Sequence, residues 1–111
     1  LNARSYLHVD DVDWASWEGA PSVEGVDVVR AAIAAVSQHH TLSDVLQAAV
    51  AYGGDTDSVA AIALGISSVS GEHLQDLPEN LHDGLERSPF GYDYLVDLDR
   101  RLMCWASQQV N

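Results

Sequence analysis

The residues that could do chemistry lie together in the middle of the chain. Asp55 and Asp57 are separated by one residue, and the hydroxyl of Ser58 follows directly. Carboxylate and hydroxyl oxygens are hard donors, which suit Mg²⁺, Mn²⁺ or Ca²⁺ better than Zn²⁺. The spacing therefore fits part of a divalent-metal site.

Two glycines, Gly53 and Gly54, stand directly before these donors, and Tyr52 stands before the glycines. Glycine adopts positive φ readily and lets the backbone approach a ligand closely. The N–H groups at the start of a following helix attract anions such as a diphosphate. One turn could therefore hold a cation with its side chains and a phosphate with its backbone. Tyr52 is a candidate for the wall of that pocket, with core packing as an equal alternative.

The same residues also fit a simpler interpretation, in which glycine ends one helix, Asp or Thr caps the next, and acidic residues favour its first turn through the helix dipole. Other metal and phosphate motifs fit less well. A calcium loop would need a ligand at Val59 and a glycine at Ala60, and a P-loop would need a lysine, which the chain lacks. Phosphatases with an Asp-x-Asp pair carry it after a β-strand, whereas residues 46–52 are alanine-rich and favour a helix.

Apolar residues recur at helical spacing from Gly25 onward, which predicts an all-α helical bundle. The first helix should bury Val26, Val29, Ile33 and Val36. The second should start at Thr41 and Asp44 as a capping pair and bury Leu42, Val45, Leu46, Ala49 and Val50. The third should start near Asp55, end by Gly71 and bury Val59, Ile62, Ile66 and Val69.

Two further helices are expected. One starts at Leu77-Pro78 and runs to about Glu86, and the last runs from about Tyr92 to Gln108. The last helix should bury a stripe formed by Leu95, Leu98, Leu102 and Trp105, pair Asp97 with Arg101, and bury Cys104 as a small apolar residue. Residues 1–24 show no period and form an irregular entry segment, whose Trp14 and Trp17 should pack on this chain or on another part of the protein.

Composition and charge exclude several functions. A formal net charge of −12 would repel nucleic acid and anionic lipid, but it suits a protein that holds a divalent cation. No apolar run is long enough to span a bilayer and no signal peptide is present, so a cytoplasmic location is expected. Because the chain starts at Leu1, we expect a fragment, a processed product or a trimmed piece of a longer protein.

The order of a helix, Gly53-Gly54-Asp55-Thr56-Asp57-Ser58, and then Val59-Ala60-Ala61-Ile62 resembles the C-terminal signature of the ADP-ribosylglycohydrolase family, which includes the dinitrogenase reductase-activating glycohydrolases. The likeness covers roughly Val26 to Leu102, and the central motif is its specific part. Ser58 stands where the family more often has Thr. Leu64 and Ser68 stand where the family often has Gly, which affects helix packing rather than the ligands.

The resemblance implies an all-α fold that holds a pair of Mg²⁺ or Mn²⁺ ions beside ADP-ribose and removes ADP-ribose from a modified side chain or a related compound. It implies that Asp55, Asp57 and Ser58 are metal ligands, and that Thr56 supports them. The family's N-terminal half, with Gly-Asp and Thr-Asp-Asp motifs, supplies the remaining ligands and the acidic residue that handles water.

Nothing before Gly25 matches either N-terminal motif, and Asp10-Asp11 follows Val9 rather than Thr. The catalytic residue is therefore not identified, and this chain alone should bind metal weakly and be inactive. Its expected partners are ADP-ribose or an ADP-ribosylated substrate, and either the N-terminal half or a second copy. The alternative hypothesis is a non-catalytic helical interaction module or a degenerate family member.

Overall fold

The structure is a computed structural model that describes residues 13–110. Its helices are α2 (Gly25–Gln38), α3 (Leu42–Ala51), α4 (Thr56–Ser68), α5 (Glu79–Asp83) and α6 (Tyr92–Gln109). Over residues 13–110 there is no strand, only an isolated parallel bridge between Thr41 and Leu74. The all-α prediction is confirmed. The chain divides into two compact units between Leu77 and Pro78, and each is described by itself.

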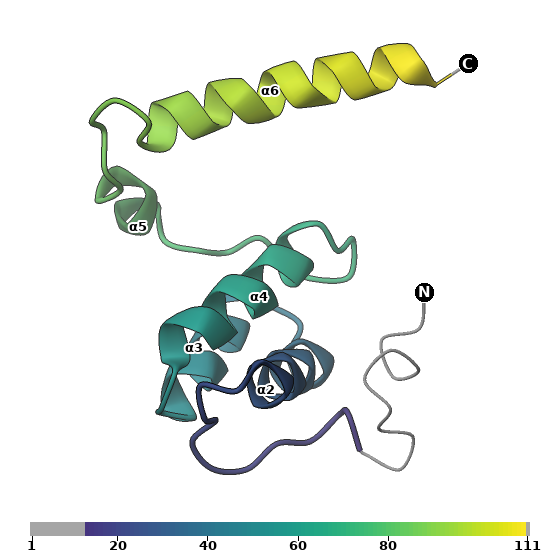
Figure 1. Cartoon of the computed structure of the whole chain (residues 1–111), viewed down its shortest axis with the longest axis vertical. Coiled ribbons are helices and arrows are strands. Elements are labelled where there is room, and N and C mark those ends of the chain that lie inside the picture. The colour runs from purple at the N-terminus through teal and green to yellow at the C-terminus, as the bar shows by residue number, and fades with distance from the viewer. Residues whose placement is uncertain (1–12, 111) are drawn as a thin grey trace. The chain divides into compact units, whose positions relative to one another are not determined.

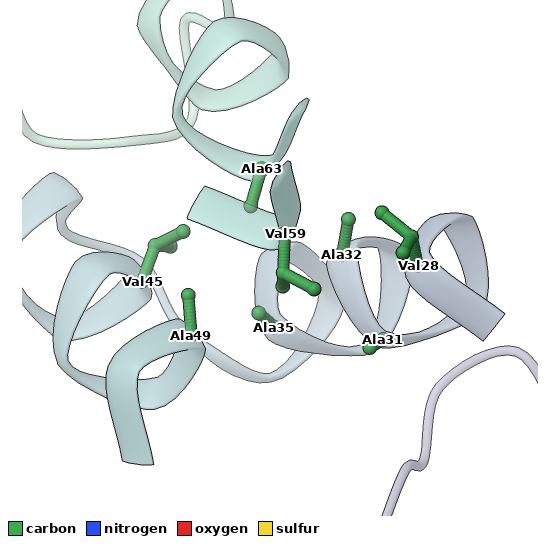
Figure 2. Packing of buried hydrophobic residues seen from close by; sticks show 8 residues of the cluster. All are labelled: Val28, Ala31, Ala32, Ala35, Val45, Ala49, Val59 and Ala63. Carbon is green, nitrogen blue, oxygen red and sulfur yellow. The ribbon is translucent and has the colours of Figure 1, made fainter. Parts of the chain in front are cut away.

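The core of the first unit forms where α2, α3 and α4 meet (Figure 1). It consists almost entirely of small side chains: Val28, Ala31, Ala32, Ala35, Val45, Ala49, Val59 and Ala63. Figure 2 shows Val59 of α4 beside the alanines of α2, with Val45 and Ala49 of α3 nearby. Alanine and valine let helix axes approach closely, so this core is thin and sensitive to added volume.

The faces that periodicity assigned to the core are only partly buried. In α2 the alanines are buried and Val26 is 40% exposed. In α4 the buried residues are Val59, Ala63 and Ser67, whereas Ile62, Ile66 and Val69 are exposed. In α3, Leu42, Val45 and Ala49 are buried as predicted, but Val50 is exposed. The prediction was wrong about these faces because it ranked residues by size, whereas close helix packing selects the small ones.

The start of α3 is held by three separate acceptors. The Thr41 hydroxyl accepts from the Asp44 N–H at 3.0 Å, which confirms the predicted cap. The Leu74 carbonyl accepts from the Leu42 N–H at 3.0 Å, and the Asp76 carboxylate accepts from the Ser43 N–H at 2.9 Å. Each of the first three backbone N–H groups of this helix therefore has an acceptor within the protein.

The segment that supplies two of these acceptors is tied to α2 as well. His73 Nε2 lies 3.2 Å from the Val36 carbonyl oxygen, and its Nδ1 lies 3.0 Å from the Ser70 hydroxyl. The Leu74 N–H donates to the His40 carbonyl at 2.9 Å. Residues 73–76 thus join the end of α2 to the start of α3.

The described part of the entry segment packs on α2. Of the two predicted alternatives, packing on this chain is therefore the one observed. Trp14 is 5% exposed, and Trp17 packs against the core cluster. The guanidinium of Arg30 lies 5.1 Å from the Trp17 ring centroid, within cation–π range. The Gln38 amide donates to the Ala15 carbonyl at 2.6 Å. An irregular segment is therefore fixed along the length of a helix.

In the second unit, α5 is shorter than the predicted helix. It ends at Asp83, because the Gly84 N–H closes the last turn on the Asn80 carbonyl at 3.1 Å. The following turn packs tightly. A Cβ at Gly91 would lie 2.3 Å from the Glu86 carbonyl oxygen, and Phe90 adopts a φ of 73°.

Helix α6 has the predicted extent but not the predicted burial. None of its residues is buried, so the stripe of Leu95, Leu98, Leu102 and Trp105 is exposed. Cys104 is exposed, which corrects the prediction that it is buried. Asp97 pairs with Arg100 at 2.5 Å and not with Arg101, so the ion pair spans three residues instead of four. Among the described helices, none is long and apolar enough to cross a membrane.

The thin core leads to a first prediction. Ala35→Leu should lower the free energy of unfolding by roughly 1–3 kcal/mol, because the added volume has no space between the helices. Ala35 is fully buried. Ala61→Leu is the matched control, since Ala61 is exposed on α4 and its substitution should change stability by less than about 0.5 kcal/mol. Urea unfolding followed by circular dichroism measures both. Equal stability of the two variants would contradict this description of the core.

Candidate functional site

The candidate site begins where α3 ends. The Tyr52 N–H donates to the Ala48 carbonyl at 3.1 Å, and the Gly53 N–H donates to the Val50 carbonyl at 3.2 Å. Gly53 and Gly54 then adopt φ of 72° and 63°, in the left-handed region that costs other residues about 1–2 kcal/mol. Both glycines thus use the positive φ that their residue type permits. These two residues turn the chain directly into α4.

Asp55 is the N-cap residue of α4 by position, but its side chain makes no capping hydrogen bond. The first bonds of the helix are made by backbone atoms: the Thr56 N–H donates to the Gly54 carbonyl at 2.9 Å, and the Val59 N–H donates to the Asp55 carbonyl at 3.2 Å. The simple cap interpretation therefore does not account for the side chain of Asp55.

Three contacts favour the ionised form of the Asp57 carboxylate. The largest is a side-chain hydrogen bond with Asp55, followed by hydrogen bonds from the backbone N–H groups of Ser58 and of Asp57 itself. Together they lower the pKa of Asp57 below its ordinary value of 3.8, with the Asp55 contact as the largest cause. Asp57 is therefore ionised at neutral pH, as a metal ligand must be. A carboxylate has about four lone-pair sites, so two N–H donors still leave capacity for a cation.

The other predicted site residues lie around this pair. Ser58 and Thr56 are half-buried in the first turn of α4, and among the described residues no partner is found for the Ser58 hydroxyl. Tyr52 packs against the core cluster, and burial raises the pKa of its phenol. The structure thus brings Asp55, Asp57 and Ser58 together on one helical turn. Roles of Gly53, Gly54 and Tyr52 in binding a ligand stay predictions.

A complete metal centre would need more ligands than this turn supplies. Within residues 13–110, no group of three or more His, Cys, Asp or Glu side chains could hold a metal ion. Two carboxylates and one hydroxyl are half or fewer of the six to eight oxygens that surround a calcium ion, or of the six around magnesium. The described residues therefore offer only a partial donor set.

Comparison with known protein families identifies the family of this chain. The family model described as ADP-ribosylglycohydrolase matches residues 3–109. The chain belongs to the ADP-ribosylglycohydrolase family. The family assignment agrees with the all-α fold and with the Gly-Gly-Asp-Thr-Asp-Ser turn between α3 and α4.

The match also extends the resemblance drawn from the sequence. It starts at residue 3, whereas the sequence likeness began near Val26, so the entry segment is included in the family pattern. Searches of curated proteins and of solved structures found no match to this chain.

The lowered pKa of Asp57 leads to a second prediction. A carboxyl whose pKa is lower in the folded than in the unfolded chain stabilises the fold above its unfolded pKa, and this contribution is lost as pH falls through the folded pKa. Asp57→Asn should therefore be less stable than the wild-type chain at pH 6, and the difference should shrink on acidification below 3.8. Thermal melts of both proteins between pH 6 and pH 2.5 measure this. A difference that is constant over the whole range would refute the assignment of the shift to folding.

Proposed function

We propose that this chain supplies one part of the metal site of a metal-dependent ADP-ribosylglycohydrolase. In this proposal Asp55, Asp57 and Ser58 are ligands of Mg²⁺ or Mn²⁺, one of a pair of ions in the complete fold. The observation that carries it is the Asp55 side chain, which takes no part in capping α4 and lies within hydrogen-bonding reach of Asp57. Family membership supports it independently.

The chemistry of the donors fits a hard divalent cation. Two carboxylates at hydrogen-bonding distance repel each other unless a proton or a cation lies between them. A divalent ion would relieve that repulsion and accept oxygen from both aspartates, while the Ser58 hydroxyl adds a neutral donor. The softer donors that would favour Zn²⁺ are not part of this turn.

The reaction would be hydrolysis of an ADP-ribosyl bond. By analogy with glycoside hydrolysis, the ribose passes through a state with oxocarbenium character. When bound, the metal pair supplies Lewis-acid charge and orientation for the ribose hydroxyls. The N-cap and first turn of α4 would hold Asp55 and Asp57 at the metal, and the positive end of the α4 helix dipole favours a nearby diphosphate. A carboxylate outside the described residues would act as the base.

A second function fits the partial donor set. With no group of three or more His, Cys, Asp or Glu in the described part of the chain able to hold a metal, the turn could persist in a non-catalytic helical module. The two functions differ in whether the turn binds a divalent cation at all. They also differ in whether ADP-ribose binding depends on that cation.

A Mn²⁺ titration of the whole chain tests the proposal. Electron paramagnetic resonance reports free Mn²⁺ directly and detects weak binding. We expect a site that the paired substitution Asp55→Asn with Asp57→Asn weakens by roughly 100-fold or more, because loss of outer partners alone costs 10- to 100-fold. Addition of ADP-ribose to the Mn²⁺-loaded chain should then produce heat in calorimetry that the paired variant lacks.

Asp44→Asn is the matched control. Asp44, like Asp57, is an exposed acidic residue in the first turn of a helix, but its side chain has no carboxylate contact among the described residues. Its substitution removes an acidic charge of the same kind without touching the site, so the Mn²⁺ affinity should stay within about twofold of the wild-type value. If Asp44→Asn and the paired variant weaken binding equally, the metal is held by diffuse negative charge, and the proposal is wrong.

A further inference from the structure

The turn that carries the candidate ligands lies against a segment more than thirty residues earlier in the chain. We call residues 17–21 the brace. A Cβ atom at Gly54 would lie 2.3 Å from the carbonyl oxygen of Pro21 and 3.3 Å from the Cβ of Ala20. Gly54 is therefore required for two reasons: its positive φ, and the absence of space for any side chain. At Gly53 an added Cβ would meet only Ala20, at an ordinary contact distance of 3.8 Å.

The brace is itself held firmly. Pro21 is buried, although it belongs to no helix. The Trp17 indole N–H donates to the Gly19 carbonyl at 2.9 Å, which closes the brace on itself. The Trp17 ring packs against the core cluster and faces the Arg30 guanidinium of α2.

Anchors lie on both sides of the brace. Upstream, the Gln38 amide donates to the Ala15 carbonyl at 2.6 Å. Downstream, the Ser22 hydroxyl donates to the Asp27 carboxylate at 2.8 Å. The two anchoring side chains belong to opposite ends of α2. The position of the brace is thus set by α2, and the brace meets the glycine turn at Pro21.

We propose that the brace is a positioning element of the candidate metal site, in which the Pro21 carbonyl fixes Gly54 and thereby the direction in which Asp55 and Asp57 enter α4. This inference rests on the proposed function of that site. In this proposal Pro21 and Trp17 are not ligands of the metal or of the substrate. They act through the turn. If Gly54 is held in place, the start of α4 is fixed, and Asp55 and Asp57 keep one arrangement.

The test compares two substitutions at adjacent glycines. Asparagine tolerates the left-handed region, so Gly53→Asn and Gly54→Asn share a small backbone cost, but only the side chain added by Gly54→Asn would collide with Pro21. We expect Gly54→Asn to lower Mn²⁺ affinity by about 10- to 100-fold, as loss of a supporting contact does at metal sites, and Gly53→Asn to lower it far less. Gly65→Asn is the control for substitution alone, because a Cβ there meets nothing within 4 Å.

Melting temperatures separate positioning from simple loss of structure. We expect the Gly53→Asn and Gly54→Asn chains to be folded at the assay temperature, with the affinity difference persisting after correction for the folded fraction. If the loss of affinity follows the loss of folded chain, the brace is only structural and the inference is overturned.

A double-mutant cycle shows whether the effect passes through Pro21. Pro21→Gly removes the fixed φ of proline and lets the carbonyl move away from residue 54. On its own it should weaken Mn²⁺ binding, but combined with Gly54→Asn it should restore part of the lost affinity. Contacting residues give such non-additive cycles, whereas independent ones add. Additive losses would mean that Gly54→Asn acts without the brace, and would overturn the inference.

Failure of this inference differs from failure of the proposed function. If the wild-type chain binds Mn²⁺ and the paired aspartate variant does not, but Gly54→Asn behaves like Gly53→Asn, then the site is real and the brace does not position it. If the wild-type chain binds no Mn²⁺, the metal site itself is refuted and the brace has nothing to position.

Discussion

Two successive residues in the left-handed region reverse the chain between α3 and α4, and the first unit depends on this reversal. Gly53 and Gly54 leave only four residues between the two helices, so α3 and α4 lie side by side and both reach α2. The same turn ends at Asp55, so the geometry that closes the core also places the candidate ligands. The fold and the candidate site therefore share these two residues.

The sequence predicted the helices that form this core, but not which of their faces are buried. Helical spacing located every described helix, and the Thr41 cap was correct because capping is decided within four residues. The buried faces were misassigned because burial depends on how closely helices approach. Ala31, Ala35 and Ala63 are fully buried where larger neighbours such as Ile62 are not. Periodicity alone does not report helix separation, so it favours the larger side chains.

The candidate site also has a part that the sequence predicts and a part that it does not. The Gly-Gly-Asp-Thr-Asp-Ser order could be interpreted from the sequence because its parts are contiguous, and the positive φ at both glycines followed from residue type. The contact between Pro21 and Gly54 could not be predicted. It joins residues 33 positions apart through a backbone carbonyl, and no side-chain pattern marks it. From the sequence, Gly54 was expected to adopt positive φ and to let the backbone approach a ligand, and the structure adds that it has no room for a side chain.

The starts of α3 and α4 use their acidic side chains differently. At α3, side chains and a carbonyl satisfy the first three N–H groups, and the Thr41 and Asp76 side chains are used up in doing so. At α4, the Asp57 carboxylate accepts from the N–H groups of its own residue and of Ser58, so the helix start is satisfied without Asp55. A cap needs one acidic residue here, and the turn carries two. The second carboxylate, Asp55, makes no capping bond and instead contacts Asp57, so capping does not account for it, whereas the proposed cation site would use both.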